Sequence, residues 1–186
     1  MKKLIFIVCA YLALIVPWQV FGAEDFSGEK GYVDFGNLTG VYGEPRVQIN
    51  LGTAMLGFVG AAAKSEEPDV AELFNKLKSV RVLVYDIDGN ADDALKTVDK
   101  VTKDIQKEGW ETIVSVNEDR EKVRIYAKMT NDKIDGLVVM AVGDDSHDNN
   151  GKPEAVFINI IGQIDPAQVG RITSRFNVDV DVDVKQ

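Results

Sequence analysis

The sequence has very little cysteine and histidine, the residues on which thiol chemistry and most zinc sites depend. Its one cysteine, Cys9, lies in an apolar N-terminal stretch, and its one histidine, His147, lies in a polar segment. A disulfide needs two cysteines, and a zinc site needs several nitrogen or sulfur donors. Disulfide frameworks, cysteine nucleophiles and ordinary zinc sites are therefore excluded, and no cofactor is expected.

Positive charge is scarce as well. The chain has 21 Lys and Arg residues against 30 Asp and Glu residues, a formal net charge of −9. Loss of Lys2 and Lys3 with an N-terminal segment would change this charge to −11. So acidic a protein is not expected to bind nucleic acid or anionic lipid by general electrostatics. The sequence also lacks a G-x-S-x-G motif and a glycine-rich phosphate loop, which makes an enzyme less expected than a binding protein.

Residues 1–22 have the layout of a secretory signal peptide. A short basic start is followed by Leu4–Val20, which contains no charged residue. Cleavage after Gly22 would place Val20 and Gly22 at the two positions that a signal peptidase inspects. The sequence therefore predicts an exported protein, periplasmic or secreted, with no membrane span after cleavage. The alternative is an uncleaved anchor, because the apolar stretch is close to the lower limit for a span, roughly 17 residues.

Beyond the signal peptide we expect an extended N-terminal arm over 23–44, a single domain over 45–177 and an acidic tail over 178–186. The arm is rich in glycine but carries spaced aromatic residues, Phe26, Tyr32, Phe35 and Tyr42. Aromatic side chains at such intervals favour an arm that docks on the domain. The tail alternates valine and aspartate, which fits a frayed terminus or an edge strand.

Hydrophobic periodicity predicts the elements of the domain. Strands are predicted over 47–51, 80–85, 110–116, 122–129, 136–142 and 155–161, and helices over 53–63, 68–77, 91–105 and 166–176. The strand over 47–51 should have one buried face. The strand over 155–161 is apolar on both sides, so it should be central and should end at the break from Gly162. Sequential strands joined by short loops predict an α+β fold, with a mostly antiparallel sheet and the helices packed on one face.

Two of the predicted helices are unusual. The helix over 53–63 is apolar on all sides and contains Gly57 and Gly60. We expect it to be buried in the core, and a contact with a membrane or a partner is the alternative. The helix over 166–176 has an apolar side, and we expect that side to fold back over the strand over 155–161.

Several segments resemble one bacterial secreted family, the domain of unknown function 4252. The segments are Gly31-Tyr32-Val33-Asp34-Phe35, Val80-Arg81-Val82-Leu83-Val84-Tyr85, Gly109-Trp110 and Phe157-Ile158-Asn159-Ile160-Ile161-Gly162-Gln163-Ile164. The resemblance implies export and an α+β fold, and it implies no catalytic residue. Some members of this family look like lipoproteins, but this chain lacks a suitable cysteine for a lipid anchor.

Two acidic clusters have the carboxylate density of calcium loops. Asp86 and Asp88 lie between a predicted strand and helix, and Asp145 and Asp148 lie in a polar loop. Neither cluster has the glutamate that an EF-hand loop carries at its twelfth position. We interpret both as turns, with a calcium-stabilised structural domain as an alternative. A carboxylate-based hydrolase or metal-dependent enzyme is a further alternative, because the sequence does not show which acids are neighbours.

The strand over 122–129 offers a candidate binding face. Its apolar residues alternate with Lys122, Arg124, Tyr126 and Lys128. If the apolar set packs under the helices, the other set presents three cations and a phenol on the open side of the sheet. We therefore expect an exported, non-enzymatic binding or structural domain of the bacterial envelope, with an envelope protein or an anionic ligand as its partner. The alternative is a solvated face neutralised by acids on neighbouring strands.

Overall fold

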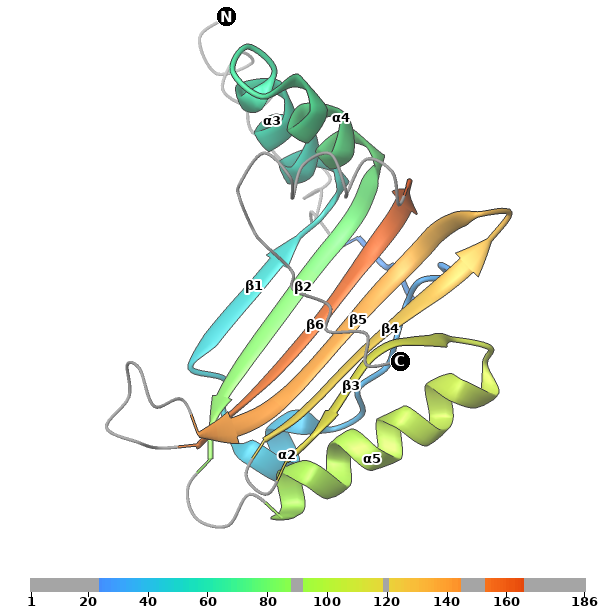
Figure 1. The fold of residues 1–186 in the computed structure, drawn as a ribbon. Coiled ribbons are helices and arrows are strands. Elements are labelled where there is room, and N and C mark those ends of the chain that lie inside the picture. The colour runs from blue at the N-terminus through green and yellow to red at the C-terminus, as the bar shows by residue number, and fades with distance from the viewer. Residues whose placement is uncertain (1–23, 88–91, 119–120, 145–152, 166–186) are drawn as a thin grey trace, which may run out of the picture.

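A six-stranded antiparallel sheet forms the centre of the molecule (Figure 1). The computed structural model describes residues 24–87, 92–118, 121–144 and 153–165. The strands are β1 Val47–Leu51, β2 Leu77–Asp86, β3 Glu111–Asn117, β4 Lys122–Thr130, β5 Lys133–Asp144 and β6 Pro153–Ile164; the helices are α2 Leu38–Tyr42, α3 Thr53–Ala63, α4 Pro68–Lys76 and α5 Asp92–Lys107. The predicted α+β fold is confirmed. The predicted helix over 166–176 and the acidic tail lie outside the described residues.

The order of the strands across the sheet is β1-β2-β6-β5-β4-β3. β6, the last described strand, therefore lies inside the sheet between β2 and β5, as its two-sided apolar sequence predicts. The strand continues to Ile164, so the predicted break at Gly162 is wrong. Gly162 pairs with Leu77 of β2, and the position needs glycine because an added Cβ would lie 2.6 Å from the Cα of Leu77.

One face of the sheet is covered by α5, α2 and the arm, and we call it the covered face (Figure 1). α5 has a narrow apolar stripe at helical spacing, and its buried members Val98, Val101 and Ile105 face the sheet. The sheet side of this core contains Tyr85, Tyr126, Val138, Met140, Val142, Ala155 and Phe157, all at most 2% exposed. This layer is the principal hydrophobic core.

The arm docks on the covered face through Asn159 of β6, which is 1% exposed. The Asn159 side chain accepts a hydrogen bond from the Val33 N–H (3.1 Å) and donates one to the Gly31 carbonyl (2.8 Å). Arg81 donates to the Val33 carbonyl (2.6 Å), and its guanidinium lies 4.9 Å from the centre of the Phe35 ring. The arm is not extended throughout, because α2 forms its final part.

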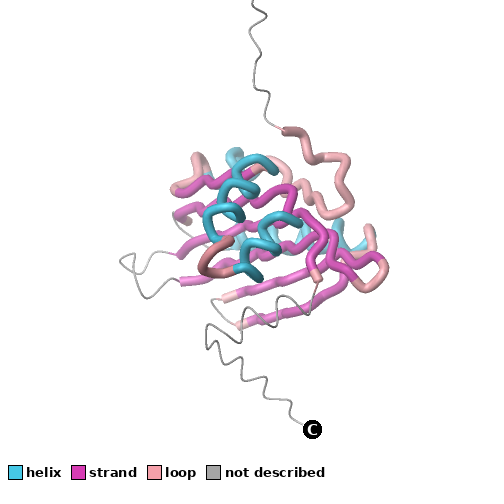
Figure 2. The backbone as a smooth tube through the Cα atoms, turned by 90° about the horizontal axis from the view of Figure 1, so that it is seen from above, coloured by secondary structure: helices cyan, strands magenta, loops and turns pink. Residues whose placement is uncertain are grey.

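α3 and α4 form a hairpin at one end of the sheet, and Figure 2 shows it over the strand ends. Its small apolar core consists of Leu56, Leu77 and Ile164, joined by half-buried Leu51, Leu73, Phe74, Val80, Ile134, Leu137 and Ile160. The first turn of α3 is held by the arm, since the Thr53 N–H donates to a carboxylate oxygen of Glu24 (2.8 Å). The hairpin is therefore fixed both by packing and by the arm.

Candidate functional site

The candidate binding face on β4 points in the direction opposite to the predicted one. Tyr126 is 1% exposed, and its hydroxyl lies 3.5 Å from Thr102 Oγ1 of α5. Lys122 pairs with Asp99 of α5 at 2.8 Å. The prediction that Lys122, Arg124, Tyr126 and Lys128 lie on the open side is therefore wrong, because these residues lie on the covered face, beneath and beside α5.

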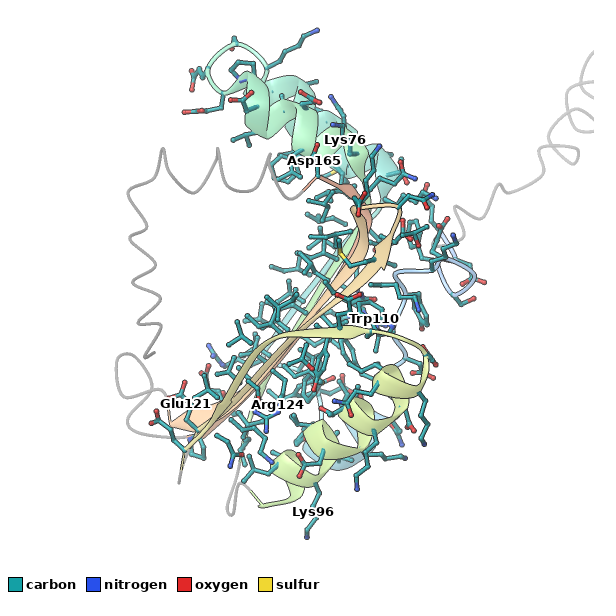
Figure 3. The ribbon with its side chains drawn as sticks, turned by 45° about the vertical axis from the view of Figure 1, so that its right-hand side comes forward. Lys76, Lys96, Trp110, Glu121, Arg124 and Asp165 are labelled. Carbon is teal, nitrogen blue, oxygen red and sulfur yellow. The ribbon has the colours of Figure 1, made fainter. Side chains whose placement is uncertain are left out.

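The cations of this set fit beside a helix because their aliphatic stems can lie against apolar groups while the charged ends reach polar ones. Lys128 donates to the Glu108 carbonyl at the end of α5, and Arg124 donates to the Val116 carbonyl of β3. Figure 3 shows Arg124 on the side of the sheet that faces α5. These side chains hold the helix and the edge strand in place, so they do not form a free surface for an anionic ligand.

The acidic candidates are placed only in part. The Asp86 carboxylate forms an ion pair with Arg46, with Oδ1 2.8 Å from Nε, and Arg46 also pairs with Glu154, which lies opposite Asp86 on β6. A cation of the protein itself thus already lies between these two carboxylates. Asp88, Asp145 and Asp148 lie outside the described residues. Across the described ranges, no three His, Cys, Asp or Glu residues are grouped so that they could hold a metal ion.

The second face of the sheet carries two apolar rows that cross all six strands. One row is Val47, Val84, Val156, Ala141, Val123 and Val116; the other is Ile49, Val82, Ile158, Val139, Ile125 and Val114. We call these twelve residues the open face. None belongs to either buried core cluster, and Ile49 is 41% exposed. The predicted buried face of β1 is therefore wrong, since Val47 and Ile49 belong to this face and no residue of β1 is buried.

The most exposed apolar group in the described residues is on α3. Phe58 is 69% exposed and Met55 is 53% exposed, and Ala54, Ala61 and Ala62 are exposed on the same side of the helix. We call these five residues the α3 patch. The expectation that α3 is a buried core helix is wrong, because only Leu56 and Gly60 are buried in it. The alternative prediction from the sequence is that this helix contacts a membrane or a partner.

The two glycines of α3 have different surroundings. At Gly60 an added Cβ would lie 2.9 Å from Asn75 Oδ1 and 3.1 Å from the Ala71 carbonyl of α4. At Gly57 an added Cβ would meet nothing within 4 Å. Gly60 is therefore needed for close packing of α3 on α4, whereas Gly57 leaves an open notch beside Phe58.

Alanine at these glycines should have opposite effects on stability. Gly57→Ala is expected to stabilise the protein by up to about 1 kcal/mol, because alanine favours the helix and meets no neighbour. Gly60→Ala is expected to destabilise it by about 1–2 kcal/mol, because the backbone of α4 cannot easily move away. Urea unfolding of both variants measures the difference, and equal shifts would contradict the described hairpin packing.

A hollow of about 650 Å³ adjoins the α3 patch. It lies between the arm and the start of α3, and its lining includes Glu24, Asp25, Phe26, Tyr32, Met55 and Arg81. The Ser27 N–H donates to the Asp25 carboxylate (2.9 Å) and so lowers the pKa of that group below its usual value. Met55 thus lies at the border between a convex apolar helix and a concave, partly acidic surface.

These features define an α+β domain with an antiparallel sheet, a docked N-terminal arm and exposed apolar surfaces. The chain belongs to the family described as a domain of unknown function (DUF4252), whose model matches residues 42–172. The match contains the resembling segments of β2 and β6, and it begins after Gly31-Tyr32-Val33-Asp34-Phe35 of the arm. A comparison with curated proteins found no match. Among the described helices, none is both long enough and apolar enough to span a membrane.

Proposed function

We propose that this protein is an exported, non-enzymatic binding domain of the bacterial envelope, and that its α3 patch docks on an apolar surface of another envelope protein. The observation that supports this proposal is the exposure of Phe58 and Met55 on a helix whose opposite side is fixed in a core. Large exposed apolar side chains that gather on one helix face are typical of interaction surfaces.

The α3 patch is preorganised for binding. Leu56 is fully buried behind it, Gly60 contacts α4, and Glu24 holds the first turn. A partner would therefore not have to order the helix on binding, which lowers the entropic cost of association. The notch at Gly57 would also let a partner backbone come close to Phe58.

Charge favours a protein partner over a lipid surface. The formal net charge of the chain is −9, and the predicted mature protein is more acidic still. Anionic lipid headgroups would repel such a protein, and α3, with 11 residues, is only about 16 Å long. A protein partner with an apolar helix or strand face would not repel the chain in this way, and an 11-residue helix is long enough to contact it.

Photo-crosslinking from α3 tests this proposal. A photoreactive phenylalanine analogue at position 58 is expected to give a discrete adduct with another envelope protein, whereas the same analogue at exposed Ile113 is not. With the purified partner, Met55→Asp with Phe58→Asp should raise the Kd at least about tenfold, since apolar anchors of this kind commonly contribute more than 1.4 kcal/mol.

The matched control is Val41→Asp with Ile113→Asp. It also introduces two carboxylates at apolar positions that are more than half exposed. Its Kd should equal that of the unmodified protein. Equal weakening by both pairs would show a general charge effect and sink the proposed docking site. Adducts with lipid in place of protein, or binding to neutral vesicles that depends on Phe58, would assign α3 to a membrane instead.

A further inference from the structure

The hollow between the arm and the start of α3 has the size and the lining of a ligand site. Its volume of about 650 Å³ lies within the range of about 300–1,000 Å³ that small-molecule pockets occupy. Its apolar wall comes from the arm, β1, α3 and β6, and consists of Phe26, Leu51, Ala54, Met55 and Ile161. Polar side chains of β1 and β2 line the same space, namely Asn50, Ser79 and Arg81. Ligand pockets commonly combine an apolar wall with a few polar groups in this way.

Two of these polar groups have hydrogen-bonding capacity that the protein does not use. Ser79 is only 9% exposed, yet its hydroxyl has no hydrogen-bond partner within the described ranges of the chain. Side-chain polar groups buried to this degree normally have a partner. Arg81 has five N–H donors, and among the described residues its one acceptor is the Val33 carbonyl (2.6 Å). Both side chains can therefore bind a molecule in the hollow without losing a contact.

The arm holds the Arg81 guanidinium in a fixed position. The guanidinium carbon lies 5.4 Å from the centre of the Tyr32 ring and 4.9 Å from the centre of the Phe35 ring. Contacts of this kind stabilise the cation and orient its plane. The planar fork of an arginine matches the geometry of a carboxylate, and a fork that is already oriented loses little entropy on binding. Arg81 is thus suited to bind a carboxylate.

Two carboxylates also line the hollow, and both are exposed. Glu24 accepts a hydrogen bond from the Thr53 N–H (2.8 Å), and Asp25 accepts one from the Ser27 N–H (2.9 Å). The lining therefore contains two negative side chains and one positive one. The carboxylates would repel a simple anion, and Arg81 would repel a simple cation. A molecule that carries one charge of each sign would be attracted by both.

The spacing of the charges suggests the length of that molecule. Arg81 lies opposite Asn50 of β1, whereas Glu24 contacts the start of α3 at Thr53. From Asn50 to Gly52 the chain advances two residues, which is about 7 Å in an extended conformation. An extended dipeptide also spans up to about 7 Å. A dipeptide could therefore bring its two charged ends to the two ends of the hollow.

We propose that this hollow binds a zwitterion of dipeptide size with apolar side chains. The carboxylate would pair with Arg81, and the ammonium group would lie near Glu24 and Asp25. The Ser79 hydroxyl would hydrogen-bond the backbone between them, and the side chains would pack on the apolar wall. This inference goes beyond the proposed function, because it assigns a small molecule to a separate site. Its test uses the isolated protein, so the outcome does not depend on a partner of the α3 patch.

Calorimetric titration of the purified protein with the dipeptide leucyl-phenylalanine tests the proposal through the ligand. The dipeptide is expected to bind. Its N-acetyl form and its C-terminal amide should each bind at least about tenfold more weakly, because each lacks one of the two charges. Equal binding of the three forms, or no binding of the dipeptide at millimolar concentration, would contradict the proposal. Tighter binding of dodecanoate would assign the hollow to a fatty acid and would overturn the zwitterion site.

Substitutions show which charge of the ligand each side chain meets. Glu24→Gln with Asp25→Asn removes both negative charges but keeps the oxygen atoms that accept the backbone N–H groups. This pair should weaken binding of the dipeptide at least about tenfold and leave binding of the N-acetyl form unchanged. Arg81→Lys should weaken binding of the dipeptide and of the N-acetyl form, but not of the amide. A merely structural role of these residues would weaken all three forms alike, and that result would overturn the assignment.

Ser79→Ala tests the site without disturbing the fold, because the hydroxyl has no partner to lose in the described structure. Tm should stay the same, and binding of the dipeptide should weaken several-fold. Unchanged affinity would contradict the contact with Ser79.

The matched control for the acidic pair is Glu118→Gln with Glu121→Gln. It also removes two exposed carboxylates, from the turn between β3 and β4. Figure 3 places Glu121 at the end of the sheet opposite to α3 and α4. The affinity of this variant for the dipeptide should equal that of the unmodified protein. Equal weakening by both acidic pairs would show a general effect of charge and would overturn the proposed site.

Discussion

Replacing Asn159 by leucine is expected to destabilise the protein by about 2–5 kcal/mol and to release the N-terminal arm. Asn159 is 1% exposed and satisfies the Val33 N–H and the Gly31 carbonyl at once. Leucine has a similar volume but no polar atom, so both backbone groups would lose their partner, and each buried unsatisfied group costs about 1–3 kcal/mol. Urea unfolding measures the loss, and limited proteolysis within residues 24–42 reports release of the arm.

Asn50 on β1 provides the matched control for this substitution. It is exposed, and Asn50→Leu should change the free energy of unfolding by no more than about 0.5 kcal/mol. Asn159→Leu with unchanged stability and an arm still resistant to protease would show that the hydrogen bonds of Asn159 do not hold the arm.

Gly31→Ala should be at least as harmful, with an expected loss of more than about 3 kcal/mol. A Cβ at position 31 would lie 2.1 Å from the Asp135 carbonyl oxygen and 2.7 Å from the Gly136 Cα. Both atoms belong to the backbone of a paired strand, so neither can move away as a side chain could. The arm itself must move, and its hydrogen bonds to Asn159 and Arg81 would be lost with it. Thermal unfolding and the same proteolysis assay measure the effect.

Two further variants make this prediction specific. Gly28→Ala should be tolerated, because a Cβ there meets nothing within 4 Å. Gly136→Ala should resemble Gly31→Ala, since its Cβ would lie 2.4 Å from the Gly31 Cα. The double variant should cost clearly less than the sum of the single ones, because an arm that has already moved offers nothing to collide with. Strict additivity would mean that the two glycines do not face each other.

Periodicity alone predicted most of the elements of this fold. The strand over 47–51 and the helix over 53–63 agree with β1 and α3 in both limits. The central place of β6 followed from its two-sided apolar sequence. These predictions depend on patterns within a single segment, and such patterns are visible without knowledge of the neighbours.

The wrong predictions concern which element covers which face of the sheet or helix. Alternation in β4 correctly divided its residues between two faces, but it could not show that α5 covers the side with Tyr126. A cationic side chain next to a helix needs an acceptor such as Asp99, and that pairing is a tertiary contact. The sequence of α3 has the same limit. A helix that is apolar on all sides has the pattern of a core helix, and this pattern does not show whether the helix is buried by its own chain or by a partner.

The position of β6 also determines when the fold can form. β2 and β5 are not neighbours, and the last described strand must enter between them before the sheet is continuous. The arm depends on the same strand, since Asn159 and Val33 are 126 positions apart in the chain. Such long-range pairing makes folding slow and leaves a partly synthesised chain without a core. The sheet therefore cannot be completed until residues 153–164 have been synthesised.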